Sequence, residues 1–294
     1  MLKNAISLYA MILFSPAKIN IGLQVIERRM DGFHNLQSLL FPVGLCDIME
    51  IRISSEAGRR LQFHQSGIQF KDSVNKNLCV RAWGLFTHEC PLPPISMHLH
   101  KQIPVGAGLG GGSSNASITL KGLNLLAGNS LSQEQLQNLA IKLGSDCPFF
   151  LQENPMMMHG RGDILSPLPI QFKPMHLILI FPQVHVSTQE AYSDVNPSKP
   201  NYYLTELIEA PLDQWKKLIV NDFEFSLFKK YPELRRIKET LYQEGAVYAS
   251  LSGSGSSLYG LFSAPPVLPK ELEQYVIWTG NIDMNILKWN PGQS

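Results

Sequence analysis

The 294-residue sequence has no excess of charge of either sign. Its 25 Lys and Arg residues nearly balance 24 Asp and Glu residues, and charged residues make up only 17% of the chain. Nucleic-acid-binding domains usually carry clustered positive charge, so a nucleic-acid partner is not expected. The hydrophobic content of 44% is enough for a sizeable core, which at this length fits one large domain or two ordinary ones.

Long apolar runs are also missing. No stretch reaches the ~18 apolar residues that a membrane span requires, so no membrane partner is expected. The apolar segment 5–14 faintly resembles the core of a signal peptide, but no small-residue cleavage site follows it. The segment continues directly into a predicted strand. We therefore interpret Met11 as a candidate natural start and residues 1–10 as a candidate upstream extension.

Cysteine is scarce and forms no recognisable pattern. The four cysteines, at positions 46, 79, 90 and 147, include no C-x-x-C pair. Such spacing is typical of reduced, mostly buried thiols, so we expect a cytoplasmic protein without disulfides. His98 and His100 alternate in a predicted strand, but no third ligand is spaced with them, so no protein metal site is predicted.

What the sequence does have is a concentration of glycine. Residues 106–112 contain five glycines in seven positions. Glycine has no side chain to pack and costs roughly 0.5–1 kcal/mol inside a helix or strand. The residues that follow have helical apolar spacing and predict a helix capped by Ser113 or Ser114. A glycine loop that opens a helix offers free N–H groups at a positive dipole end, which indicates a phosphate site. A tight turn without a ligand is the alternative.

Three known phosphate loops do not fit this segment. A Walker A loop needs Gly-Lys-Ser/Thr, whereas Ser113 follows Gly112 directly. Residues 106–111 match G-x-G-x-x-G, but a dinucleotide fold needs a second strand about 20 residues later. A helix with a capping box is predicted there instead, over residues 132–143. The protein-kinase signatures Val-Ala-Ile-Lys and His-Arg-Asp are absent, so the loop binds phosphate by another scheme.

Other polar residues have two interpretations each. An alternating strand places Lys18 and Asn20 on the same face, which suits either a site or an ordinary solvated face. Phe33 and His34 follow a predicted turn, and the pair suits either stacking on a base or plain packing. Asp146 precedes Cys-Pro, so it is either a helix N-cap or a carboxylate placed in a cleft.

Strands and helices are predicted along the whole chain. Strands are expected over 12–26, 36–43, 47–53, 60–64, 97–100, 176–181, 245–251 and 258–262. Helices are expected over 77–88, 113–127, 132–143, 204–219 and 232–244. Residues 155–171 are expected to form a loop near a domain boundary. Residues 252–257 form a second glycine turn, which matters only if it closes over the first loop.

Taken together, these segments resemble the GHMP small-molecule kinases, in the same order and over nearly the whole chain after Met11. The matching motifs are Pro16–Asn20, Asp31–His34, Pro104–Asn115, Gly144–Phe150, Gly160–Gly162 and Leu251–Ser257. The glycine motif identifies the superfamily, and the Lys-Ile-Asn and Asp-Gly-Phe-His motifs indicate a member with a cytidyl substrate. Phe33, Ser145 and Cys147 replace the usual Tyr, Ala and Val, and these departures remove no group that the chemistry needs.

The resemblance implies a two-domain α+β fold with the active site in the cleft between the domains. A ribosomal-protein-S5-like nucleotide domain would span residues 1–158, and a ferredoxin-like substrate domain residues 159–294. The implied reaction is ATP-dependent phosphorylation of the 2-hydroxyl of a diphosphocytidyl methylerythritol, in non-mevalonate isoprenoid precursor synthesis, with Mg²⁺ carried by the nucleotide. The alternatives are another GHMP kinase acting on a sugar, homoserine or a mevalonate-like alcohol, and a nucleotide-binding protein without turnover.

The resemblance also implies roles for individual residues. Lys18 and Asp146 correspond to the catalytic pair, and Asn77 and Lys101 to residues near the adenine. The cytidyl and sugar side would be lined by Asn20, Phe33, His34 and Tyr192. The triphosphate would lie along Pro104, Val105, Gly106, Ala107, Gly108, Leu109, Gly110, Gly111, Gly112, Ser113 and Ser114. The partners are therefore expected to be small molecules, and the oligomeric state stays open.

Overall fold

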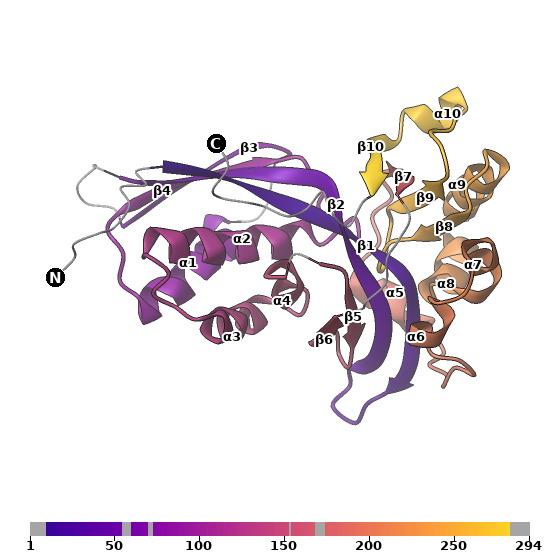
Figure 1. Ribbon diagram of the computed structural model, residues 1–294, viewed down its shortest axis with the longest axis horizontal. Coiled ribbons are helices and arrows are strands. Elements are labelled where there is room, and N and C mark those ends of the chain that lie inside the picture. Colours follow the sequence, from indigo (N-terminus) through magenta and orange to yellow (C-terminus); the bar gives the residue numbers. More distant parts are fainter. Residues whose placement is uncertain (1–9, 55–59, 70–72, 153, 168–173, 283–294) are drawn as a thin grey trace. The chain divides into compact units, whose positions relative to one another are not determined.

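The computed structural model describes residues 10–54, 60–69, 73–152, 154–167 and 174–282. The candidate upstream extension 1–10 lies, apart from Ala10, outside these residues. The chain forms two compact units (Figure 1), and each contains helices and strands, which confirms the predicted α+β class. One unit consists of Met1–Ala17, Leu45–Val105 and Gly110–Gln152, and the other of Lys18–Gly44, Gly106–Leu109 and Glu153–Ser294.

The first unit is a sheet with helices on one face (Figure 1). Strand β4 (Ile95–Lys101) pairs antiparallel with the C-terminal part of β2 (His34–Ile53) and parallel with β3 (Leu61–Gly67). Alternate strand residues and the apolar helix faces form one buried core between the two layers. The helices are η1 (Val74–Lys76), α1 (Leu78–Glu89), α2 (Gly111–Leu126), α3 (Gln133–Leu143) and α4 (Cys147–Phe150).

The second unit contains the N-terminal part of β2, which pairs antiparallel with β5 (Met156–His159), and β5 pairs with β6 (Ile164–Pro167). Strand β1 (Ala10–Arg28) also pairs with β2. A four-stranded antiparallel sheet has the order β10-β7-β9-β8, from Val276–Ile282, Met175–Ile180, Leu258–Phe262 and Tyr248–Leu251. The helices are α5 (Thr188–Ser193), α6 (Leu204–Leu207), α7 (Leu212–Leu218), α8 (Phe223–Lys230), α9 (Pro232–Gln243) and α10 (Lys270–Glu273).

Several predicted element boundaries are wrong. The two strands predicted over 36–43 and 47–53 are the single strand β2. Gly44, which suggested a turn between them, lies inside this strand and packs against the Trp278 indole. A Cβ at Gly44 would lie 2.9 Å from the Trp278 ring. The predicted loop 155–171 contains β5 and β6, whose short runs give little periodic signal. The predicted helix 204–219 is interrupted before Pro211, which lacks an amide donor.

One of the two predicted helix caps is present, and the cysteines are unpaired. The capping box of Ser132 and Gln135 at α3 is confirmed. Helix α2 starts at Gly111, after Gly110 with a φ of 68°, so the predicted cap by Ser113 or Ser114 is wrong. Glycine adopts this left-handed backbone without strain, so the helix can begin directly after Gly110. The four cysteines are free thiols, as predicted. Within the described ranges, no helix is both long and apolar enough to cross a membrane.

Candidate functional site

Lys18 and Asn20 of β1 lie side by side in the interior of the second unit. Their exposed fractions are 4% and 2%, so the interpretation of a solvated strand face is wrong. The Lys18 ammonium donates to Asn20 Oδ1 and, over 2.8 Å, to the carbonyl oxygen of Gly108. The Asn20 amide donates in turn to Ser38 Oγ over 2.8 Å. A buried ammonium is costly unless it is paired, and these acceptors hold it as a fixed positive charge beside the glycine loop.

The second glycine turn, residues 252–257, closes over residues 106–109 of the first loop. Ser252 Oγ donates to the carbonyl oxygen of Gly108 over 3.0 Å, and the Ser257 amide donates to that of Ala107 over 3.1 Å. Gly108 has a φ of 77°, and a Cβ there would lie only 2.1 Å from the Ser252 carbonyl oxygen. The second glycine turn therefore does close over the first loop, and it is part of the candidate site.

The start of α2 provides donors for an anion in the first unit. The first N–H groups of a helix have no partner within the helix, and they lie at its positive dipole end. Ser114, in the first turn, is fully buried, and its hydroxyl finds no hydrogen-bond partner within the described parts of the chain. A buried hydroxyl is normally satisfied. An unsatisfied one beside free N–H groups fits a bound phosphate group or its counter-ion.

A buried carboxylate that the sequence did not predict lies behind this helix start. Asp47 of β2 is fully buried and pairs with the Lys101 ammonium. It also accepts hydrogen bonds from the amides of Gln102 and Ile103, over 2.7 and 2.8 Å, and from the side chain of Asn115 over 2.8 Å. Asp47 therefore ties the strand that enters the loop to the helix that leaves it. Burial lowers the pKa of Lys101, and the charge of Asp47 opposes this shift.

We expect Asp47→Ala to lower the free energy of unfolding by about 3–5 kcal/mol, the usual result of leaving one member of a buried pair alone. The matched control is Asp31→Ala, because Asp31 forms an exposed pair with Arg29. Urea titration followed by circular dichroism measures both variants. Equal and small effects of the two substitutions would contradict the structural role given to Asp47.

The residues expected on the cytidyl side all belong to the second unit. The ring stacked on Tyr192 is that of His34, at 4.9 Å between centroids and 23° between planes, whereas Phe33 is 57% exposed. The guanidinium of Arg161 lies 5.2 Å from the centroid of the Phe33 ring. A base stacked on this face of Tyr192 would have to displace His34. Burial lowers the pKa of His34, so the imidazole is neutral near pH 7 and can both donate and accept a hydrogen bond.

Asn77 and Asp146 both stand at helix starts in the first unit, but only the Asn77 side chain accepts a capping hydrogen bond. Asn77 Oδ1 accepts a hydrogen bond from the Cys79 amide over 2.9 Å at the start of α1. Asp146 precedes α4 with φ −80° and ψ −15°, and its side chain makes no capping bond to the described residues of that helix. Asp146 therefore occupies the predicted N-cap position, with proline in the first turn, but its carboxylate does not cap the helix. The half-buried carboxylate is thus not used by its own helix.

The alternating histidines of β4, His98 and His100, share a serine partner. The Ser66 hydroxyl lies 2.9 Å from Nε2 of His98 and 2.9 Å from Nδ1 of His100. Among the residues that the structure describes, no three His, Cys, Asp or Glu side chains are grouped for a metal ion.

Comparison with known proteins gives concordant matches. The model of the GHMP kinases N terminal domain matches residues 77–154, and that of the GHMP kinases C terminal matches residues 204–274. A Bacteroides thetaiotaomicron protein named 4-diphosphocytidyl-2-C-methyl-D-erythritol kinase is 46% identical over 260 residues, which are 88% of this chain and 95% of that protein. A Parabacteroides distasonis protein of the same name is 41% identical over 274 residues, 92% and 100% of the two chains. A crystal structure of 4-(cytidine 5'-diphospho)-2C-methyl-D-erythritol kinase has a TM-score of 0.78 and 31% identity, over 93% of this chain and 99% of its own.

Proposed function

The chain belongs to the GHMP kinases, and we propose that it transfers the terminal phosphoryl group of ATP to the 2-hydroxyl of 4-diphosphocytidyl-2-C-methyl-D-erythritol. The observation that carries the proposal is the buried ammonium of Lys18, held on the carbonyl of Gly108 inside the glycine loop. A fixed cation at a phosphate loop suits phosphoryl transfer, and the names of the relatives indicate the acceptor. The family's α+β fold has two domains, which we place at residues 1–158 and 159–294.

The reaction needs positioning and charge neutralisation more than covalent chemistry, because its transition state is loose. We assign the triphosphate to residues 104–114, where the N–H groups at the start of α2 meet the phosphate oxygens. Lys18 neutralises developing negative charge or polarises the acceptor hydroxyl. Asp146 orients this hydroxyl and accepts its proton late, since a carboxylate is a poor base for an alcohol.

The remaining assignments follow the resemblance. Asn77 and Lys101 border the adenine. The Lys101 ammonium is already paired with Asp47, so Lys101 does not use this charge to bind the base. Asn20, Phe33, His34 and Tyr192 line the cytidyl and sugar side. Mg²⁺ arrives with the nucleotide and neutralises phosphate charge, and the unsatisfied Ser114 hydroxyl fits contact with this ion or with a phosphate oxygen. The four free thiols suit a cytoplasmic location.

The direct test is mass spectrometry after incubation with ATP, Mg²⁺ and the cytidyl substrate. The proposal expects a product one phosphoryl group heavier and stoichiometric ADP. Parallel reactions contain homoserine, mevalonate or galactose in place of the cytidyl substrate. Phosphorylation of one of these alone would identify a different GHMP kinase, and ATP binding without ADP release from any mixture would identify a protein without turnover.

We expect Phe33→Ala to raise the KM for the cytidyl substrate and to leave the KM for ATP unchanged. One stacked ring contributes about 1–3 kcal/mol, by analogy with single-stranded nucleic acids. Because Phe33 is 57% exposed, its loss costs the fold little. Phe33→Tyr, the usual family residue, is expected to be mild. Phe225→Ala, with 81% exposure in the same unit, is the matched control and should change neither KM. A larger effect on ATP in steady-state kinetics would refute the assignment.

A further inference from the structure

A short segment of the second unit, residues 220–224, is bound to the strand that carries Lys18 and Asn20. The Leu23 amide donates to the carbonyl oxygen of Val220 over 2.9 Å, and the Asp222 amide donates to that of Leu23 over 2.9 Å. Asp222 Oδ2 also accepts from the Val25 amide over 2.7 Å. The segment is therefore fixed to β1 a few residues beyond Lys18 and Asn20.

The same segment holds the second glycine turn through Asn221. The Asn221 side-chain amide donates to the carbonyl oxygen of Leu251 over 3.0 Å and to that of Gly253 over 2.9 Å. Its Oδ1 accepts from the Phe223 amide over 3.0 Å. Asn221 is only 2% exposed, so water cannot replace these bonds at low cost.

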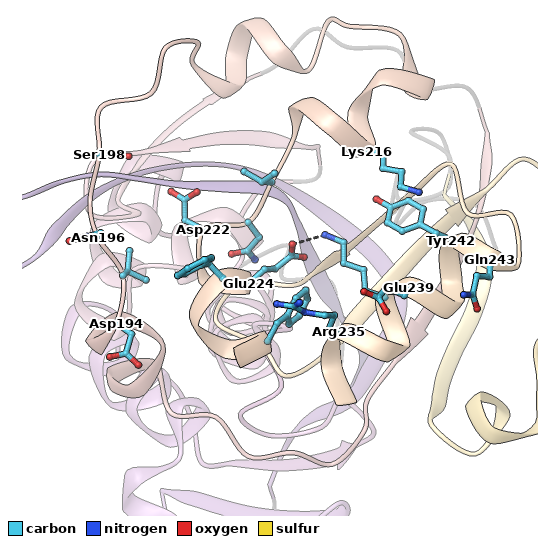
Figure 2. Close-up of a pocket in the computed structure, with 16 residues that line it drawn as sticks. Asp194, Asn196, Ser198, Lys216, Asp222, Glu224, Arg235, Glu239, Tyr242 and Gln243 are labelled. Atoms are coloured by element: carbon cyan, nitrogen blue, oxygen red, sulfur yellow. Dashed lines mark hydrogen bonds and ion pairs between the residues drawn. The ribbon is translucent and has the colours of Figure 1, made fainter. Parts of the chain in front are cut away.

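Glu224 holds the strand that leads into the turn. Its Oε1 accepts from the Leu251 amide over 2.9 Å and from Ser250 Oγ over 3.1 Å. Its Oε2 pairs with the Lys238 ammonium, marked by the dashed line in Figure 2. Glu224, Asn221 and Asp222 line a cavity of about 1000 Å³, and Figure 2 shows Glu224 among its lining side chains. Both carboxylate oxygens of Glu224 already have partners within the protein. We therefore infer that this part of the cavity wall stabilises the second glycine turn.

The supported turn lies close to Lys18, which we assign to catalysis, and to Asn20, which we assign to substrate binding. A Cβ at Gly253 would lie 3.1 Å from Asn20 Oδ1 and 3.2 Å from the Lys18 ammonium. Ser252 shares the Gly108 carbonyl oxygen with Lys18. Gly253 and Gly255 have φ values of 57° and 82°, which glycine adopts without strain, so the backbone of the turn can lie close to these groups. A displacement of the turn would therefore directly change the surroundings of the Lys18 ammonium.

We propose that Asn221 and Glu224 are positioning residues for phosphoryl transfer. They hold the second glycine turn against Lys18, Asn20 and Gly108, while residues 220–224 hold the strand on which Lys18 and Asn20 stand. This inference rests on the proposed function and adds two residues to it, which act through the second glycine turn and the strand. Because reacting groups tolerate little displacement, loss of this support lowers the rate of the chemical step more than it weakens binding.

The first test is Asn221→Asp, which keeps the side-chain shape and the acceptor for the Phe223 amide. It replaces the side-chain NH₂ group by an oxygen, which cannot donate to the carbonyl oxygens of Leu251 and Gly253 and is repelled by them. We expect kcat to fall by more than about tenfold, with KM for either substrate changed by less than about threefold. Circular dichroism and the urea midpoint show whether the variant is folded at the assay temperature.

The second test compares Glu224→Ala with Glu224→Gln. Alanine removes the acceptor for the Leu251 amide, whereas glutamine retains an oxygen at that place and loses the charge. We expect glutamine to restore most of the kcat that alanine loses, although both variants lose the ion pair. Lys238→Gln is the control, since it breaks the same ion pair without touching the turn, and it should keep the wild-type kcat.

The outcomes separate this inference from the proposed function. A wild-type enzyme that does not phosphorylate the cytidyl substrate refutes the proposed function, whatever the variants do. With an active wild type, the inference is overturned if folded Asn221→Asp keeps its kcat, or if KM rises and kcat does not fall. It is also overturned if kcat of Glu224→Gln is as low as kcat of Glu224→Ala. If Asn221→Asp does not fold, the comparison of the two Glu224 variants alone tests the inference.

Discussion

Asp146→Asn is expected to lower kcat by about 10²–10⁴-fold, the usual contribution of a positioned acid or base, and to leave ATP affinity unchanged. The carboxylate is half-buried before α4, and the described residues of this helix donate no capping hydrogen bond to it. Asparagine keeps the size of the side chain but cannot accept a proton. A coupled assay of ADP release measures kcat, and calorimetric titration with a non-hydrolysable ATP analogue measures affinity.

The control for Asp146→Asn is a true helix cap in the same unit. Ser132 accepts a hydrogen bond from the Gln135 amide over 3.2 Å at the start of α3. We expect Ser132→Ala to lower the free energy of unfolding by about 1 kcal/mol and to keep kcat. If Asp146→Asn behaved in this way, with lower stability and normal turnover, Asp146 would be a structural residue and not a catalytic one.

Gly108→Ala is expected to lower kcat/KM for ATP by at least about a hundredfold, because small displacements of reacting groups are that costly. Gly108 has a φ of 77°, where an L-residue is strained by roughly 1–2 kcal/mol. The new Cβ would also lie 2.1 Å from the Ser252 carbonyl oxygen, so the glycine turn has to move away. Steady-state kinetics with varied ATP measures the effect.

The matched control for Gly108→Ala is Gly84→Ala in α1. A Cβ at Gly84 meets no described atom within 4 Å, and the backbone there is helical. Alanine is expected to raise the free energy of unfolding by up to about 1 kcal/mol and to leave the ATP kinetics as in the wild type. Equal kinetics for the two variants would show that the contact between the two glycine turns does not shape the nucleotide site.

The sequence by itself determined the features that depend on neighbouring residues. The helix that follows the glycine loop and the capping box at Ser132 are local, because their hydrogen bonds join residues three or four positions apart, although the exact start of the first helix at Gly111 was not predicted. The alternation of β1 indicated that Lys18 and Asn20 share a face. The free thiols also followed from the absence of a cysteine pattern.

Only the tertiary structure decided what surrounds these features. Lys18 meets Gly108, which is 90 positions away, and Asp47 meets Lys101, which is 54 positions away. Single polar residues such as Asp47 or Asn221 follow no motif or period, so nothing along the chain distinguishes them from surface residues. Their role comes from burial, since a buried charge or amide must be paired, and the fold alone determines its partner.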